Sequence, residues 1–335
     1  MTEAEISNLI AIGNFPDPCR HSNLVETHIS WVILCDQYVY KIKKPIRYSF
    51  LDFSTPEKRK YFCDREVMLN RRLTTDMYLG VIPVQETEVG IHLGKGPGKS
   101  IDHAVRMRRM DGKRQMNILL NTGQVSPDDI RLLAARVARF HQKAEIFYAK
   151  DIFEIGEKFK DLAAESAHLS IALGVHAGQL IERSLTASAR FLNQNAEVLK
   201  TRLTDGFYRD GHGDLHCRNI FLQSEPVIFD CIEFSDDFRQ VDVLNDVAFL
   251  CMDLDAFGRQ DLSDLFLKTY NRKFPVIRSR NEQCLFSYYK SYRANIRAKV
   301  NSLRSRDAGY ANKEKALEEA EKYLKLMAGY IADIF

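Results

Sequence analysis

One short segment of the chain brings together side chains that can bind a hard metal ion and move a proton. It reads His212-Gly-Asp-Leu-His-Cys-Arg-Asn219 and is followed by Val-Ile-Phe-Asp230. Residues 219–222 and 227–230 are mainly apolar runs around a proline-containing turn, which predicts a β-hairpin. Asn219 begins one strand and Asp230 ends the other, so both side chains should lie at its open end. Because Mg²⁺ prefers a few hard oxygen ligands, this pair predicts a magnesium site.

Asp214 lies five residues before Asn219, on the loop that leads into the hairpin. In that position it could accept a proton from a hydroxyl group, or orient an attacking hydroxyl beside the metal. The alternative is a glycine-containing turn in which Asp214 and Asn219 only satisfy backbone groups. The occurrence of the whole set at this spacing favours the chemical interpretation.

A second set of candidates lies nearer the N-terminus. In a predicted strand over residues 38–43, Lys41 and Lys43 project from the same face. Glu66 lies on the apolar stripe of a predicted helix, because it follows helical spacing with Phe62, Leu69 and Leu73. A carboxylate there needs a cationic partner. We prefer Lys41 as that partner, with Lys43 as the alternative, and such a pair can align nucleotide phosphates. The other interpretation is two solvated lysines and a glutamate at the rim.

The elements that must position these residues can be read from periodicity and turn signals. Strands are predicted over residues 31–35 and 38–42, and a helix is predicted from the capping box Ser54-Thr-Pro-Glu57 to about Leu73. Two further strands, residues 81–84 and 103–110, are joined by a glycine-rich turn over 90–98. A capped helix begins at Ser126-Pro127, and the remaining chain is mainly helical apart from the hairpin. The prediction is an α+β protein with a mixed β-sheet small lobe, residues 1–112, and a mainly helical large lobe, residues 113–335.

Length and composition limit the classes of protein to consider. The 335 residues are 45% hydrophobic, and 48 basic side chains nearly balance 45 acidic ones. No overall charge therefore favours a nucleic-acid partner, and no apolar run approaches the roughly 20 residues that span a bilayer. The seven cysteines are odd in number and contain no CxxC pair, which predicts free thiols, no zinc site and a cytoplasmic location. The oligomeric state stays open.

The segment that begins at His212 resembles the H-G-D-x-H-x-x-N motif of the aminoglycoside phosphotransferases and their protein-kinase-like relatives, with Asp230 in place of the kinase D-F-G aspartate. The segments Glu-Thr-His-x-Ser-Trp-Val, Tyr-Lys-x-Lys-Lys-Pro and Leu-Asp-Phe-Ser-Thr resemble an uncharacterised bacterial branch of that family. The similarity covers most of the chain. Some members resemble fusions with a downstream P-loop domain, which we expect this chain to be too short to contain.

This resemblance implies a two-lobed protein-kinase-like fold and an ATP- and Mg²⁺-dependent transfer of the γ-phosphoryl group to a small-molecule hydroxyl. It implies that Asp214 is the catalytic base and that Asn219 and Asp230 are the metal ligands. His216 stands where protein kinases carry a lysine, and it could neutralise charge on the phosphoryl group or be an ordinary loop histidine. By the same resemblance, His212 supports the loop and Asp246 braces it.

The phosphate-covering loop departs from the protein-kinase pattern. Residues 26–31 contain no glycine, so Thr27, His28 and Ser30 would have to contact phosphate through hydroxyls and backbone amides. The chain also lacks an A-P-E segment after Asp230. Two alternatives remain: a non-catalytic nucleotide-binding regulatory protein, which would not need Asp214, and a protein-directed kinase of the same fold.

Two further segments could mislead a motif search. Residues 94–100 resemble a Walker A loop, but Leu93 stands where that motif needs glycine and a strand is predicted next, so we interpret them as a hairpin turn. Residues 288–306 carry six basic side chains and no acid. A solvated helical face is the common explanation. If this segment borders the acceptor site, it predicts that polycationic aminoglycosides are poor substrates.

Overall fold

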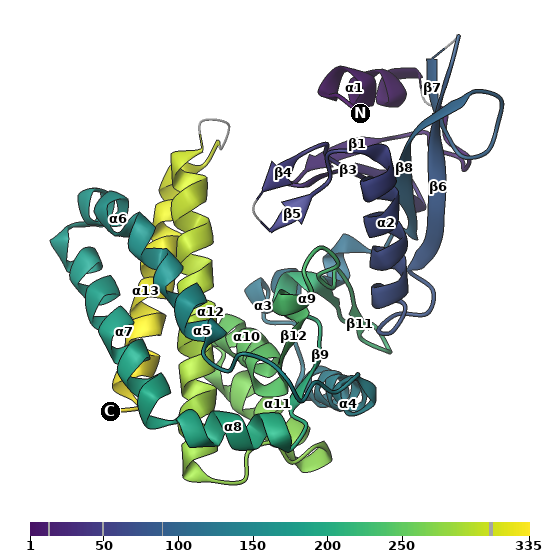
Figure 1. Ribbon diagram of the computed structural model, residues 1–335. Coiled ribbons are helices and arrows are strands. Elements are labelled where there is room, and N and C mark those ends of the chain that lie inside the picture. Colours follow the sequence, from purple (N-terminus) through teal and green to yellow (C-terminus); the bar gives the residue numbers. More distant parts are fainter. Residues whose placement is uncertain (13, 49, 89, 308–310) are drawn as a thin grey trace. The chain divides into compact units, whose positions relative to one another are not determined.

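The chain folds into two units, each with its own core. The computed structural model describes residues 1–12, 14–48, 50–88, 90–307 and 311–335 (Figure 1). The N-terminal unit comprises Met1–Leu119 with Arg218–Phe238, and the C-terminal unit comprises Leu120–Cys217 with Arg239–Phe335. The chain passes between them within α3 (Met116–Asn121), α9 (Asp236–Arg239) and the 3₁₀ turn Cys217–Asn219.

A six-stranded antiparallel sheet forms the framework of the N-terminal unit, in the order β1-β2-β3-β8-β6-β7. Its strands are β1 (Asn23–Glu26), β2 (Ser30–Leu34), β3 (Tyr38–Lys43), β6 (Tyr78–Thr87), β7 (Gly90–Leu93) and β8 (Lys99–Arg108). A separate hairpin joins β4 (Arg47–Tyr48) to β5 (Leu51–Asp52). Strand β7 corrects the prediction of a turn over residues 90–98, because Ile91 and Leu93 alternate into the core. The turn is confined to the residues between β7 and β8.

Helix α2 (Pro56–Asn70) lies against β6 and β8, while α1 (Glu3–Ile12) lies beside β7 (Figure 1). Helix α2 starts one residue later than predicted, with Thr55 as its N-cap, because the Ser54 hydroxyl donates to Asp52 Oδ1 at 2.6 Å instead. It also ends at Asn70 and not near Leu73. The short antiparallel pair β10 (Ile220–Phe221) and β11 (Val227–Ile228) forms the predicted hairpin in this unit.

Alternation along β3 divides its side chains between two hydrophobic clusters. Tyr40 and Ile42 join the cluster that contains the buried residues of α1, whereas Val39 packs with Cys63 and Val67 of α2. The period of two therefore directs Lys41 and Lys43 toward α2. This placement determines which helix can supply their partner.

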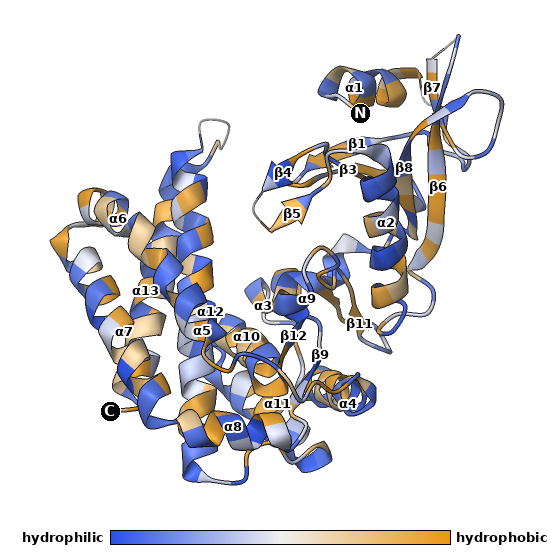
Figure 2. Cartoon of the chain, viewed as in Figure 1, coloured by the Kyte–Doolittle hydropathy of each residue, from blue (hydrophilic) through white to orange (hydrophobic). Residues whose placement is uncertain are grey.

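The C-terminal unit is built almost entirely from helices. They are α4 (Pro127–Lys143), α5 (Glu154–Lys160), α6 (Ser166–Leu173), α7 (Val175–Gln194), α8 (Ala196–Thr204), α10 (Val243–Ala256), α11 (Gln260–Lys273), α12 (Arg280–Arg306) and α13 (Lys313–Ala332). Helix α10 is buried on all sides against α11 and α12, while α7 and α13 carry both hydrophobic and hydrophilic residues (Figure 2). A small sheet pairs β9 (Tyr208–Asp210) with β12 (Gln240–Asp242), and a 3₁₀ turn occurs at Asp161–Glu165, whereas the 3₁₀ turn Gly112–Arg114 belongs to the N-terminal unit. The sequence analysis missed β9 and β12 because three residues are too few for a periodic signal.

Cys19 and Cys35 form a disulfide, which corrects the prediction that all the cysteines are free. They are 16 residues apart in the chain, and the segment before β1 is held beside the end of β2 by a 2.8 Å bond from Arg20 N to Asp36 Oδ2. Sequence spacing alone cannot show such proximity. Four other cysteines are buried free thiols, and Cys284 is half-buried. Within the described ranges, none of the helices combines the length and apolar character needed to cross a bilayer.

A buried arginine ties three elements of the C-terminal unit together. The guanidinium of Arg202 on α8 donates to both oxygens of Asp242 at 2.5 and 2.8 Å, and to Glu282 Oε1 at 2.9 Å. It also donates to the Val276 carbonyl at 2.6 Å. Since Arg202 is fully buried, its charge depends on these acids.

Replacing Arg202 by methionine should lower the free energy of unfolding by about 3–5 kcal/mol, because two buried carboxylates lose their partner. Chemical denaturation of the full chain measures this loss. The control is Arg131→Met, which removes an exposed pair with Asp128 and should cost about 0–1 kcal/mol. Equal losses in the two variants would contradict the structural role of Arg202.

Candidate active site

Five charged residues of the N-terminal unit form one continuous network. Lys41 Nζ lies 2.8 Å from Glu66 Oε1 and 2.7 Å from Asp230 Oδ1. Lys43 Nζ lies 2.7 Å from Glu66 Oε2 and is also paired with Glu233. Each carboxylate oxygen of Glu66 therefore accepts from a different lysine.

The surroundings of the two lysines differ, although the sequence left both open as partners of Glu66. The side chain of Lys43 is fully enclosed, whereas that of Lys41 is 11% exposed and reaches Asp230, which is 43% exposed. Burial alone would lower the pKa of Lys41, but Asp230 and Glu66 raise it well above its ordinary value. Burial would raise the pKa of Glu66, and the two lysines lower it to about 2. Lys41 is thus a permanent cation at the accessible end of the network.

The two predicted metal ligands lie at the same end of the β10–β11 hairpin. Phe229 N donates to the Asn219 carbonyl at 3.0 Å, so Asp230 follows directly after the residue paired with Asn219. Asp230 has a positive φ of 62°, and its amide donates to the Tyr78 hydroxyl at 3.2 Å. An amide oxygen and a carboxylate are suitable ligands for Mg²⁺, which takes its other ligands from water and phosphate.

Other acidic residues do not extend this set into a closed metal cage. Glu233, the first acidic residue after Asp230, is 3% exposed and paired with Lys43. Asp236 is paired with Arg65. Among the described residues, no group of three or more His, Cys, Asp or Glu side chains could hold a metal ion. A metal at Asn219 and Asp230 would therefore have few protein ligands.

The predicted phosphate-covering loop is a tight turn between β1 and β2. Thr27 N donates to the Ser30 carbonyl at 2.9 Å, and Ser30 N donates to the Thr27 hydroxyl at 2.9 Å. These bonds close the turn without glycine. His28 is exposed, whereas Ser30 is fully buried opposite Lys43, and its hydroxyl lacks a hydrogen-bond partner among the described residues. Of the three loop residues predicted to contact phosphate, His28 and Ser30 thus lie in different environments.

Asp214 and His216 form a pair in the C-terminal unit. His216 Nε2 lies 3.3 Å from Asp214 Oδ2, and Asp214 N donates to His212 Nδ1 at 3.2 Å. The Asp214 side chain is 37% exposed. Burial would raise the pKa of Asp214, but His216, His212 and Arg297 together hold it well below its ordinary value. Asp214 is therefore an ionised acceptor throughout the neutral range.

Asp246 of α10 holds the backbone of the loop that carries Asp214. Its Oδ2 accepts from His212 N at 2.6 Å, and its Oδ1 accepts from Gly213 N at 2.9 Å. A Cβ atom at Gly211 would lie 2.6 Å from Asp246 Oδ2, so this close approach requires glycine. His141 of α4 contacts the same carboxylate at 3.2 Å. The sequence analysis missed His141, although it continues the buried stripe of α4 at helical spacing.

One arginine of α12 contacts this loop, and a second arginine follows it by one helical turn. Arg293 donates to the Gly213 carbonyl at 2.9 Å and to Asn245 Oδ1 at 2.7 Å. Arg297, one turn later, is 9% exposed and stacks over Tyr323 with 5.4 Å to the ring centroid. The i, i+4 spacing of these arginines could have indicated a shared face, but not what that face contacts.

The basic segment over residues 288–306 is not an uncompensated positive surface, which corrects the sequence-based interpretation. Lys290 pairs with Asp255 at 2.9 Å, Lys299 with Asp161 at 2.8 Å and Arg306 with Glu165 at 3.1 Å. These acids come from α10 and from the 3₁₀ turn Asp161–Glu165. Tertiary folding therefore supplies acidic partners to three of the six basic side chains of this segment.

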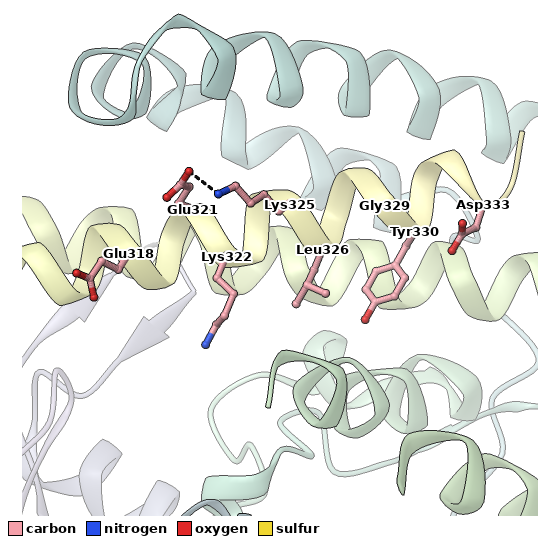
Figure 3. A pocket seen from close by; sticks show the side chains of 8 residues that line it. All are labelled: Glu318, Glu321, Lys322, Lys325, Leu326, Gly329, Tyr330 and Asp333. Atoms are coloured by element: carbon pink, nitrogen blue, oxygen red, sulfur yellow. Dashed lines mark ion pairs between the residues drawn. The ribbon is translucent and has the colours of Figure 1, made fainter. Parts of the chain in front are cut away.

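A shallow hollow of about 510 Å³ runs along α13 (Figure 3). Glu318, Lys322, Leu326 and Tyr330 stand at four-residue intervals on one face of the helix, and Glu321 pairs with Lys325 at 2.7 Å. None of the residues that the sequence predicts for the site lines this hollow. The candidate chemistry therefore does not use it.

The contacts of the buried Asp246 carboxylate should make the free energy of unfolding fall at acid pH. Burial would raise the pKa of Asp246, but His141, His212 and Arg293 lower it to about 2, against 3.8 for a free aspartate. Its stabilising effect is therefore complete above about pH 4 and is lost as the pH falls toward 2. Over that range, Asp246→Asn should remove about 2 kcal/mol of the pH-dependent change in unfolding free energy. Denaturation at a series of pH values measures the slope, with Asp128→Asn as the exposed control, and an unchanged slope would contradict this role.

Known proteins resemble this chain in sequence and in architecture. No model of a known protein family matches the chain. Uncharacterised proteins of Mycobacterium tuberculosis and Mycobacterium bovis are 34% identical to it over 286 residues, which is 83% of this chain and 54% of each relative. The chain thus spans about half the length of the curated relatives it matches.

Solved structures share the architecture at low sequence identity. A choline kinase from Cryptosporidium parvum has a TM-score of 0.56 and 11% identity, covering 99% of this chain and 97% of the kinase. A thermostable mutant of aminoglycoside phosphotransferase APH(4)-Ia has a TM-score of 0.51 and 10% identity, covering 98% of both chains. A GDP complex of a mutant aminoglycoside 2'-phosphotransferase-IIIa has a TM-score of 0.50 and 14% identity, covering 95% of both. As the sequence predicted, this chain has the α+β, protein-kinase-like fold of the aminoglycoside phosphotransferases and choline kinases.

Proposed function

We propose that this chain is an ATP- and Mg²⁺-dependent phosphotransferase that moves the γ-phosphoryl group to a hydroxyl of a small molecule. The observation that carries the proposal is the buried Lys41–Glu66 pair, whose lysine also contacts Asp230. A kinase needs this combination to align phosphates next to a metal ligand. Asp214 lies five residues before Asn219 in the chain, and its carboxylate would accept the proton of the substrate hydroxyl.

Nucleotide binding is assigned to residues of the N-terminal unit. Lys41 Nζ has three donors, of which Glu66 and Asp230 occupy two, so a third can point to phosphate oxygen. Asn219 and Asp230 would hold Mg²⁺, which supplies charge neutralisation for the phosphates. The turn between β1 and β2 would cover them through the exposed His28, whereas the fully buried Ser30 is not assigned a phosphate contact. The GDP-bound structural neighbour supports nucleotide use, while the choice of ATP is our proposal.

Asp214 is suited to orient the hydroxyl of the acceptor. Because its pKa is held low, its carboxylate is ionised and accepts a hydrogen bond from the hydroxyl group. A weak base takes the proton late, when the bond from hydroxyl oxygen to phosphorus is already forming, which suits a loose transition state. His216 contacts this carboxylate at 3.3 Å, and we assign it to support of Asp214.

The class of acceptor is left at small-molecule hydroxyls. The sequence-based argument against aminoglycosides assumed a basic helix without acidic partners, and the salt bridges of α12 remove that assumption. Arg293, one of these basic residues, contacts the loop that carries Asp214, so replacing it by glutamate would disturb that loop and could not report on the charge of the acceptor. We place the activity in the cytoplasm, where ATP is made. The Cys19–Cys35 disulfide is the observation against that location, since disulfides are rare there.

Asp214→Ala should lower phosphoryl transfer by roughly 10²–10⁴-fold and leave the affinity for Mg·ATP nearly unchanged. ATP consumption against pooled hydroxyl metabolites measures turnover, and calorimetry measures nucleotide affinity. Asp128→Ala, at a side chain that is 84% exposed, is the control. Equal turnover in Asp214→Ala and wild type would contradict the catalytic assignment and favour the nucleotide-binding regulatory alternative.

Asp230→Ala should abolish the Mg²⁺-dependent part of nucleotide binding, because it removes the only carboxylate that we assign to the metal. A thermal-shift titration with ATP, in the presence of Mg²⁺ or of a chelator, measures this part as the ligand-dependent rise in Tm. Asp64→Ala removes an exposed carboxylate of α2 and should behave as wild type. A variant at position 230 that still gains stability from Mg·ATP, but not from ATP with chelator, would disprove the metal role.

A further inference from the structure

The second lysine of the network is not needed to bind phosphate, yet it is completely enclosed. Lys43 Nζ contacts Glu66 Oε2 at 2.7 Å and Glu233, and it lies 4.9 Å from the centroid of the Phe53 ring. A ligand cannot reach this side chain, since its exposed fraction is zero. A buried ammonium group is costly unless it is paired. We therefore assign Lys43 a structural role, which is to hold the carboxylates of Glu66 and Glu233 in position.

Glu233 is the last residue of the segment 230–233, which contacts the rest of the N-terminal unit through Asp230, Cys231 and Glu233. Asp230 contacts Lys41, and Cys231 N donates to Asn70 Oδ1 at 2.9 Å. Asn70 in turn donates to the carbonyl of Glu66 at 2.9 Å. Lys43 holds Glu233 at the far end. The segment after the candidate metal ligand is therefore fixed to α2 and β3 together.

The two lysines would respond differently when a ligand binds. Lys41 is partly exposed, and its partner Asp230 would be shared with a metal ion, so its contacts change with ligand. If Glu66 depended on Lys41 alone, a buried carboxylate would lose part of its charge compensation at that moment. Lys43 and Glu233 do not contact the exposed end of the network. Their pairing can hold Glu66 in either state.

We propose that Lys43 and Glu233 are positioning residues whose ion pair locks α2 and residues 230–233 in the nucleotide-competent arrangement before nucleotide arrives. The ion pair between Lys41 and Glu66 then forms without help from a ligand or a covalent modification, because Lys43 already holds Glu66 in place. The functional part of this inference rests on the phosphotransferase proposal. The locking of α2 is a property of the free protein and can be measured without nucleotide.

The test uses the full chain with Lys43→Met, Glu233→Gln and the double variant. Lys60→Met is the matched control, because Lys60 lies on α2 in an exposed pair with Asp64. Glu233→Gln keeps the size of the side chain, so it remains informative if Lys43→Met folds poorly. Hydrogen exchange over residues 56–70 is measured without ligand, and Mg·ATP affinity is measured by calorimetry well below Tm.

We expect exchange over residues 56–70 to rise, and Mg·ATP affinity to fall, by roughly tenfold in each single variant, with no change in Lys60→Met. The double variant should resemble the single ones, since both remove the same interaction. Exchange and affinity within about twofold of wild type, or single effects that multiply in the double variant, would overturn the inference. If wild type itself fails to bind Mg·ATP, the proposed function is wrong, and the exchange data still decide whether the pair locks α2.

Discussion

The arrangement of the N-terminal unit depends on one requirement, the compensation of the buried Glu66 carboxylate. A fully enclosed carboxylate is unstable unless cations and hydrogen bonds replace its water. Lys41 and Lys43 provide one cation for each oxygen, which is possible because both project from the same face of β3 toward α2. Each lysine needs a further acid, and the chain supplies both from the segment after the β10–β11 hairpin. A single buried charge therefore links a strand, a helix and a segment nearly two hundred positions away in the chain.

The C-terminal unit uses a buried carboxylate in a different way. Asp246 accepts from the backbone amides of His212 and Gly213, so it determines the path of the main chain and not the position of a cation. Gly211 is needed because a side chain there would collide with the same carboxylate. Arg293 contacts the Gly213 carbonyl, so the loop is held through both its donors and its acceptors. These contacts fix the backbone beside Asp214, while its side chain is paired with His216.

Charge patterns along the chain gave a wrong picture of the local charge where the oppositely charged partners are distant in sequence. The segment over residues 288–306 has six basic side chains without an acid, yet three of them pair with acids on other elements. The reverse case occurs after Asp230, where the chain carries the acidic residues Glu233, Asp236 and Asp237, and Glu233 is matched by Lys43 and Asp236 by Arg65. A local excess of charge along the chain is a reliable sign of a field only when folding brings no counter-charge to it.

The sequence by itself determined the fold class and the candidate residues, because these depend on local signals. Alternation put Lys41 and Lys43 on one face, helical spacing put Glu66 on an apolar stripe, and the hairpin brought Asn219 and Asp230 to one end. Only the tertiary structure decided which partners these groups have. Both lysines share Glu66, and Cys19 meets Cys35. Pairings between residues far apart in the chain depend on the packing of whole elements, and periodicity records the face of an element but not what lies opposite it.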